Sequence, residues 1–191
     1  MQFPTKYKCL SQNEFHKGDF KIIPIRFEDR IDIMNWRNEQ IHHLRQVKPL
    51  TEKSQEHYFN GSVVMLFDQE KPNQILFSYL KNGMCIGYGG LVHINWIDKN
   101  AEISFVLKTN ITQNDFTINW RNYLKLIEKV AFQELKLKKI FTYAFDIRPQ
   151  IYPIFENSGF EREAELKNHC YVENEFKSVI IHSKINKKIK N

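Results

Sequence analysis

The stretch that decides the fold is residues 101–145, AEISFVLKTNITQNDFTINWRNYLKLIEKVAFQELKLKKIFTYAF. Its two ends, AEISFVL and KIFTYAF, are rich in β-branched and aromatic side chains, which predicts a strand at each end. A helix is expected between them, from near Thr117 to near Leu135. Its apolar residues recur at helical spacing: Trp120, Tyr123, Leu124, Ile127, Val130 and Ala131. Because a strand–helix–strand unit crosses over in the right-handed sense, the two strands should lie parallel.

An antiparallel meander is predicted directly upstream of this unit. Its strands are expected at Gln74–Leu80, Met84–Ile94 and Ala101–Leu107. Asn82-Gly83, between the first two, is the strongest two-residue signal for a hairpin. Inside the second strand, three glycines predict either a β-bulge or the close approach of another backbone: Gly87, Gly89 and Gly90.

The remaining segments complete a mixed α/β order. Further strands are predicted at Phe20–Phe27, Glu161–Tyr171 and Phe176–Ser183, and helices at Glu28–Asn38, Glu52–Phe67 and Tyr152–Asn157. The whole order is β-α-α-β-β-β-α-β-α-β-β. Residues 19–186 are expected to form one domain, between a loose N-terminal arm at 1–18 and a basic C-terminal tail at 187–191.

Composition favours a single-domain globular protein, with 191 residues of which 42% are hydrophobic and 26% charged. No apolar run reaches the roughly 18 residues of a membrane helix, and the first ten residues lack a signal-peptide core. We therefore expect a cytoplasmic protein without a membrane partner. The cysteines, Cys9, Cys85 and Cys170, form no close pair, which predicts free thiols.

The net charge of +6 does not predict a nucleic-acid partner, because part of it lies in the tail. Exposed aromatic side chains that could stack on bases are also not indicated, since Phe141, Tyr143 and Phe145 alternate as in a core strand. His169-Cys170 comes with no oxyanion loop, and His42-His43 has no carboxylate at metal-ligand spacing. Neither a cysteine nucleophile nor a metal site is expected.

Four motifs resemble the GNAT N-acetyltransferases, over about residues 20–185. Trp36-Arg37-Asn38 resembles the W-R-N of the branch that includes ribosomal-protein alanine acetyltransferases and amino-sugar acetyltransferases. Ile86–Gly90 resembles that branch's third strand, and Lys99–Phe105 its fourth, commonly A-E-I-G-[FY]. Phe155–Phe160 resembles the Y-E-K-x-G-F that closes the last helix.

The resemblance implies acetyl-CoA as donor and a primary amine as acceptor. It also implies a V-shaped opening between the two parallel strands, where pantetheine pairs with the backbone of Phe105, Val106 and Leu107. The W-R-N residues Trp36, Arg37 and Asn38 are implied to bind the acceptor, and Arg148 to bind the donor.

Two positions depart from the family pattern. The pyrophosphate loop usually carries glycines, whereas residues 108–117 have none, so the donors expected there are Lys108, Thr112, Gln113 and Asn114. Asp115 is expected to be the N-cap of the long helix. The tyrosine that usually protonates the leaving thiolate is replaced by Phe155. Tyr152, one turn earlier, is the substitute that we expect.

Glu102 is the leading candidate for the group that takes the proton of the amine, with His93 on the adjacent strand as the second candidate. A salt-bridged Glu102 without a catalytic role remains an equal alternative. We expect an acetyl transfer to a small-molecule amine, an amino sugar on a nucleotide carrier being favoured. The alternatives are a protein N-terminus as acceptor or a non-catalytic binding module. A homodimer is left open.

Overall fold

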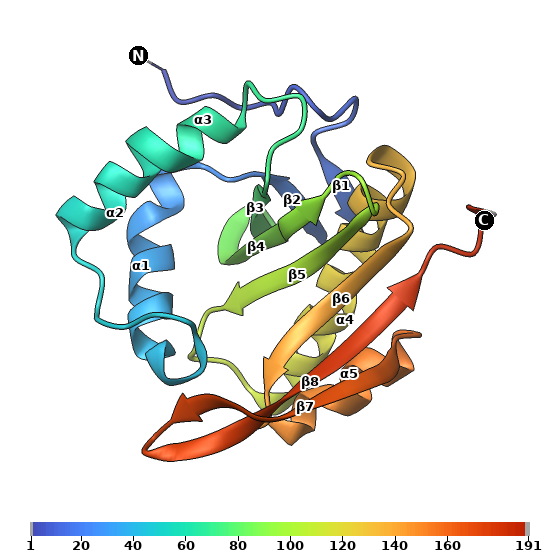
Figure 1. Ribbon diagram of the computed structural model, residues 1–191. Coiled ribbons are helices and arrows are strands. Elements are labelled where there is room, and N and C mark those ends of the chain that lie inside the picture. The colour runs from blue at the N-terminus through green and yellow to red at the C-terminus, as the bar shows by residue number, and fades with distance from the viewer. Residues whose placement is uncertain (1, 190–191) are drawn as a thin grey trace.

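The computed structural model describes residues 2–189. A single twisted sheet of eight strands forms its centre, in the order β1-β2-β3-β4-β5-β6-β8-β7. In Figure 1, α4 and α5 pass behind the sheet, whereas α1 and α2 lie beside each other to the left of its strands. This mixed α/β fold, with one parallel junction at β5/β6, confirms the predicted fold class.

The strands follow the predicted order, preceded by one that the sequence did not predict. They are β1 (Phe15–Lys17), β2 (Phe20–Pro24), β3 (Ile75–Lys81), β4 (Met84–Asn95), β5 (Asn100–Leu107), β6 (Lys139–Phe145), β7 (Glu161–Val172) and β8 (Glu175–Ile185). The hairpin at Asn82-Gly83 is confirmed, with both residues at positive φ as a tight turn requires.

The helices are α1 (Arg30–Glu39), α2 (Glu52–Tyr58), α3 (Val64–Leu66), α4 (Gln113–Glu128) and α5 (Tyr152–Asn157). Two π-helical segments continue α2 and α4, at Phe59–Val63 and Lys129–Glu134. Short 3-10 turns lie at Phe27–Asp29, Ile41–His43 and Pro149–Ile151. No helix within residues 2–189 is both long and apolar enough to cross a lipid bilayer.

The start of α4 differs from the prediction. The helix begins at Gln113, not near Thr117, and its N-cap is Thr112, not Asp115. The hydroxyl of Thr112 accepts a hydrogen bond from the backbone N–H of Asp115 at 3.1 Å and donates one to the Asp115 carboxylate at 2.8 Å. Both residue types cap helices well, so composition alone could not choose between them.

The N-terminal segment is not a loose arm, as the sequence predicted, but part of the core. Tyr7, Leu10 and Phe15 are buried, and Phe15–Lys17 pairs with β2. The hydroxyl of Tyr7 donates to the carbonyl of Leu76 at 2.8 Å. Polar residues between these three positions hide the apolar pattern in the sequence. Of the predicted tail, Lys187 to Ile189 are described, and residues 190–191 lie outside the described part of the chain.

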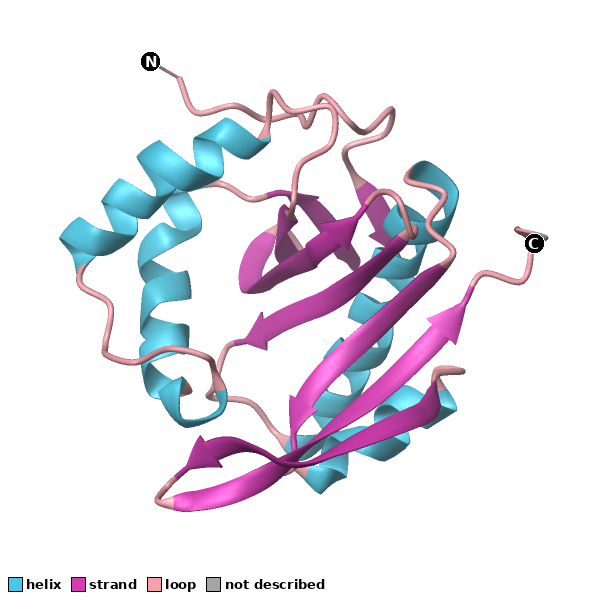
Figure 2. Ribbon diagram, viewed as in Figure 1, coloured by secondary structure: helices cyan, strands magenta, loops and turns pink. Residues whose placement is uncertain are grey.

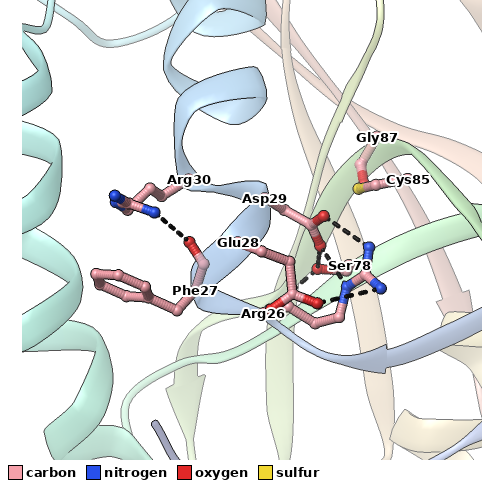
Figure 3. Close-up of polar contacts among 8 residues, drawn as sticks. All are labelled: Arg26, Phe27, Glu28, Asp29, Arg30, Ser78, Cys85 and Gly87. Carbon is pink, nitrogen blue, oxygen red and sulfur yellow. Dashed lines mark hydrogen bonds and ion pairs between the residues drawn. The ribbon is translucent and has the colours of Figure 1, made fainter.

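A buried polar cluster fixes the entry into α1 (Figure 3). The carboxylate of Asp29 accepts two hydrogen bonds from the guanidinium of Arg26, at 2.7 and 2.8 Å, and one from the hydroxyl of Ser78 on β3 at 2.5 Å. The nearby thiol of Cys85 donates to the carbonyl of Gly87. Burial raises the pKa of this thiol to about 12, which keeps it protonated and unreactive.

The glycines of β4 allow close packing on both sides of the strand. A Cβ at Gly89 would lie 2.1 Å from the carbonyl oxygen of Ser104 on β5, and one at Gly90 would lie 1.9 Å from that of Ile75 on β3. A bulge also interrupts the β3/β4 ladder between Tyr79 and Leu80. Both predicted roles of the glycines, bulge and close approach, are therefore present.

Candidate active site

The parallel strands β5 and β6 diverge, as predicted. They pair only at Asn100–Glu102 with Lys139–Phe141, and beyond that point β6 pairs with β8 alone. Figure 2 shows the two arrows separating toward their C-terminal ends. A cavity of about 610 Å³ lies at this opening and extends toward α1 and α2. The divergence thus ends the pairing between β5 and β6 beyond Glu102 and Phe141.

The backbone groups of β5 that face the opening follow from the register. The N–H of Lys108 donates to the carbonyl of Ile86 on β4, so the even-numbered residues of this strand point toward β4. Because the backbone N–H and C=O groups of successive residues point to opposite sides of a strand, those of Phe105 and Leu107 point into the opening. Val106, which the sequence predicted to be available, pairs instead with Tyr88. The carbonyl of Leu107 accepts a hydrogen bond from the side chain of Gln40 at 2.8 Å.

Glu102 occupies the vertex of the opening, at the last paired position of β5. Its side chain is 8% exposed and both carboxylate oxygens accept hydrogen bonds. One accepts from the guanidinium of Arg45, in the loop between α1 and α2, and the other accepts from Nδ1 of His93 at 2.9 Å. Glu102 and His93, predicted separately as candidates, therefore form one group.

A β-bulge brings His93 to the cavity. Val92 pairs with Glu102, and the next pair is Asn95 with Asn100, so two residues of β4 stand opposite Ala101 alone. His93 has φ +50°, a left-handed conformation that is uncommon for residues other than glycine. Side chains alternate between faces in a regular strand, so without the bulge His93 would lie on the face opposite to Val92 and Glu102. All three line the cavity.

Among the charged side chains in the wall of the cavity, cations outnumber anions. Arg37, Arg45 and Arg148 line it, whereas Glu102 is the only carboxylate there among the described residues. Burial lowers the pKa of Arg148 to about 10. Burial, followed by the charge of Arg148, lowers the pKa of His43 to about 3, so this imidazole is neutral. Each cation in this wall would be stabilised by an anionic group on a bound molecule.

The W-R-N residues divide into two roles. Arg37 lines the cavity, where its guanidinium donates to the hydroxyl of Tyr88 at 2.6 Å. Asn38 instead holds the loop that follows α1, because its side chain exchanges hydrogen bonds with the backbone of Leu50 at 2.7 and 2.9 Å. Trp36 is half-buried against the core and does not line the cavity. Of the three, only Arg37 is placed to contact an acceptor.

The predicted acid, Tyr152, is not at the cavity. Its hydroxyl donates to the carboxylate of Asp146 at 2.8 Å, and burial, with this bond as the second cause, raises its pKa. Phe155, one turn later, does line the cavity and packs against Trp120. A shared helix face was therefore a poor guide, because this short helix packs Phe155 inward and turns Tyr152 toward Asp146. Among the tyrosines that line the cavity, Tyr143 lies on β6 itself.

The start of α4 offers two of the four donors that the sequence predicted for a pyrophosphate. Gln113 and Asn114 are exposed at the first turn, where backbone N–H groups favour anions. Lys108 directly follows the end of β5, and Thr112 uses its hydroxyl in the helix cap. The open backbone at Phe105 and this helix N-terminus fit an extended thioester followed by phosphates, which is the shape of acetyl-CoA.

Three residues of the site were missed in the sequence: His43, Arg45 and Tyr143. The two basic residues belong to the loop between α1 and α2, for which no pattern indicates a contact with β5. Tyr143 was assigned to the core because of its alternation with apolar neighbours. A group of three or more metal-ligating side chains close together does not occur within residues 2–189.

A mixed sheet that opens between two parallel strands, next to a helix N-terminus suited to phosphates, defines the class of the CoA-dependent acyltransferases. Comparison with known sequences agrees, since residues 22–180 match the family described as the acetyltransferase (GNAT) domain. The chain therefore belongs to the GNAT acetyltransferase family. It is an N-acetyltransferase that uses acetyl-CoA.

Solved structures with this fold include spermidine N-acetyltransferases of Vibrio cholerae. One of them, in complex with CoA and spermine, has a TM-score of 0.76 and 17% sequence identity, and the match covers 88% of this chain and 96% of that chain. A dodecameric structure in an intermediate state has a TM-score of 0.74 and 18% identity, with 90% and 96% covered.

Proposed function

We propose that the chain acetylates a primary amine on a small molecule that also carries negative charge, with a nucleotide-linked amino sugar as the favoured class. The observation that carries this proposal is the charge of the cavity wall, where Arg37, Arg45 and Arg148 face a single carboxylate. That carboxylate, Glu102, already accepts hydrogen bonds from Arg45 and His93. The phosphates of a nucleotide carrier would bind such cations.

Polyamines fit this wall less well, although two solved relatives are described as spermidine N-acetyltransferases. Two like charges at about 4 Å repel by about 4 kcal/mol at the effective dielectric near a protein surface. Besides the Arg45–Glu102 ion pair, a molecule with several ammonium groups would meet the guanidinium groups of Arg37 and Arg148, which have no carboxylate partner among the described residues of this cavity. The fold is shared with those enzymes, but the charge of this wall supports a different acceptor.

In the proposed reaction, the chain of the donor lies along the open backbone of Phe105, and its thioester lies near Glu102 at the vertex. The pyrophosphate lies at the start of α4, near Gln113 and Asn114, with Arg148 close to the donor. The amine reaches the thioester from the side of Arg37. We propose Tyr143, in place of Tyr152, as the hydroxyl that protonates the leaving thiolate, because it lines the opening on β6.

An acceptor screen tests the proposal. Purified protein would be mixed with acetyl-CoA and a panel of amines, and the release of CoA thiol would be measured. The panel contains nucleotide-linked amino sugars, the corresponding free amino sugars, spermidine and a peptide that begins with alanine. We expect the highest kcat/KM for a nucleotide-linked amino sugar, and a higher KM for it in Arg37→Gln. Preference for spermidine or the peptide would contradict the proposal.

An assembly of more than one copy belongs to the same proposal, because one relative with this fold is dodecameric. Light scattering of the purified protein would measure the mass in solution. A mass equal to the 23.0 kDa of one chain would exclude it.

A further inference from the structure

We propose that His93 takes the proton from the acceptor amine, and that Glu102 is the positioning residue that holds the imidazole for this task. The inference rests on the proposed function only in that the enzyme acetylates an amine. It reverses the order of candidates that the sequence suggested, in which Glu102 came first.

The contacts of Glu102 argue against a direct role as proton acceptor. Both of its oxygens already accept hydrogen bonds, from Arg45 and from His93. Its side chain is 8% exposed, whereas that of His93 is 64% exposed. These two donors and the surrounding side chains cover the carboxylate, so an incoming amine has little access to its remaining lone pairs. The exposed imidazole is open to the cavity.

The same contact fixes the tautomer of His93. An ionised carboxylate accepts hydrogen bonds and cannot donate them, so the proton of the 2.9 Å contact must lie on Nδ1. In the neutral imidazole, Nε2 then carries a lone pair and is the acceptor. Nε2 makes no hydrogen bond with the rest of the described chain, which leaves it open to a ligand in the cavity.

The backbone supports a functional position for this histidine. Its positive φ is an uncommon conformation for a residue other than glycine and costs free energy. The bulge that imposes this conformation places the imidazole on the face of Glu102, at the vertex of the opening. Arg45 and His93 each contact one oxygen of Glu102, so the carboxylate is held from two sides. The guanidinium of Arg45 also lies 4.6 Å from the centre of the Tyr143 ring.

The proton balance of the reaction closes with this assignment. The acceptor arrives as an ammonium and loses one proton to bulk water before attack. The nitrogen lone pair then forms a bond to the thioester carbon, and His93 Nε2 takes the second proton as the tetrahedral intermediate forms. The C–S bond breaks next, and the thiolate takes a proton from the hydroxyl of Tyr143, which regains one from protonated His93 by way of solvent. The products are an amide, CoA thiol and one free proton.

A spectroscopic test needs no acceptor. Long-range 1H–15N correlation spectra of the labelled full chain report which imidazole nitrogen carries the proton, and the signals of His93 are assigned by their loss in His93→Gln. In the neutral imidazole we expect the proton on Nδ1, and its transfer to Nε2 in Glu102→Ala. A proton on Nε2 in the unmodified chain would overturn the proposal. This readout stays valid even if every amine of the acceptor screen fails.

A kinetic test uses the amine with the highest turnover in the screen and acetyl-CoA. We expect His93→Gln to lose about a hundred-fold to ten-thousand-fold in kcat, the usual cost of a general base, with little change in the KM for acetyl-CoA. Glu102→Gln should lose less, because its amide oxygen still accepts from Nδ1. Added imidazole should restore part of the rate of His93→Ala. His57→Ala, on the exposed face of α2, is the control and should keep full rate.

The opposite ranking would overturn the proposal. If Glu102→Gln loses the larger factor while His93→Gln stays near full rate, the carboxylate itself takes the proton. A failure of imidazole to raise the rate of His93→Ala would likewise count against the histidine. Melting temperatures of all variants separate these outcomes from loss of folding.

Discussion

At the scale of single residues, the first prediction concerns two tyrosines: Tyr143, which lines the cavity, and Tyr152, which does not. Tyr143→Phe should lower kcat by about a hundred-fold or more, because it removes the only tyrosine hydroxyl that the described part of β6 presents to the cavity. Tyr152→Phe should keep near-normal turnover, since its hydroxyl is bound to Asp146. Steady-state rates of the two variants check this, and equal losses in both would contradict it.

The cluster of Arg26, Asp29 and Ser78 gives a prediction about stability. Asp29→Ala leaves a half-buried guanidinium and a buried hydroxyl without their acceptor, and should cost about 3–5 kcal/mol of unfolding free energy. Glu28→Ala is the matched control, because Glu28 contacts the same guanidinium at 3.3 Å from the surface. It should cost less than about 1 kcal/mol. Urea unfolding of both variants measures the difference, and similar losses would refute the assignment.

At the scale of elements, the start of α4 is an anion site that holds a carboxylate of its own. Asp115→Asn should tighten binding of acetyl-CoA by about two- to five-fold, because a negative charge near a helix N-terminus competes with phosphate for the same field. Calorimetric titration gives the Kd. Asp68→Asn, beyond the end of α3, is the control and should leave the Kd unchanged. Weaker binding in Asp115→Asn would show that the phosphates bind elsewhere.

Elements with a strong local pattern could be predicted from the sequence, and contacts between distant segments could not. The crossover of residues 101–145 combines a helical period with two apolar strands, so the parallel pairing of these strands could be predicted. The turn at Asn82-Gly83 could be predicted from those two adjacent residues alone. By contrast, the bulge at His93 depends on the register between β4 and β5, and the contact of Arg45 with Glu102 depends on where a loop folds back. Neither the bulge nor this contact can be predicted from the spacing of residues in the sequence.

The site shows the same division. Glu102 and His93 were found because they belong to strands whose position was predictable, whereas their hydrogen bond was not. Tyr152 was chosen by helical spacing alone, and tertiary packing turned its hydroxyl toward Asp146. The buried N-terminal segment was missed for a similar reason, since Tyr7 finds its partner at Leu76, far along the chain.

At the scale of the whole molecule, two histidines predict how stability depends on pH. Burial lowers the pKa of His182, whose side chain is fully buried, and that of His43 to about 3. In the unfolded chain both would titrate near 6.5, so the unfolded state binds more protons below that pH. Stability is therefore highest above about pH 6.5 and falls as the pH is lowered toward 3, by at most about 1.4 kcal/mol per pH unit for each group.

Urea unfolding midpoints between pH 7.5 and about 4 measure this slope. His182→Phe, which cannot take a proton and keeps a ring against Phe155 and Tyr152, should show a shallower decline than the unmodified chain. His57→Ala, at an exposed position, should leave the slope unchanged. An identical slope in His182→Phe would mean that this histidine takes no part in acid unfolding.

The short pairing between β5 and β6 has a mechanical consequence. Three residue pairs join the part of the sheet that ends at β5 to the part that begins at β6, while β6 pairs with β8 along its whole length. A pulling force across this junction would meet few backbone hydrogen bonds before the two parts slide apart. Small rotations about the same three pairs would change the width of the opening and leave both half-sheets intact, so a thioester could enter and a thiol could leave without unfolding.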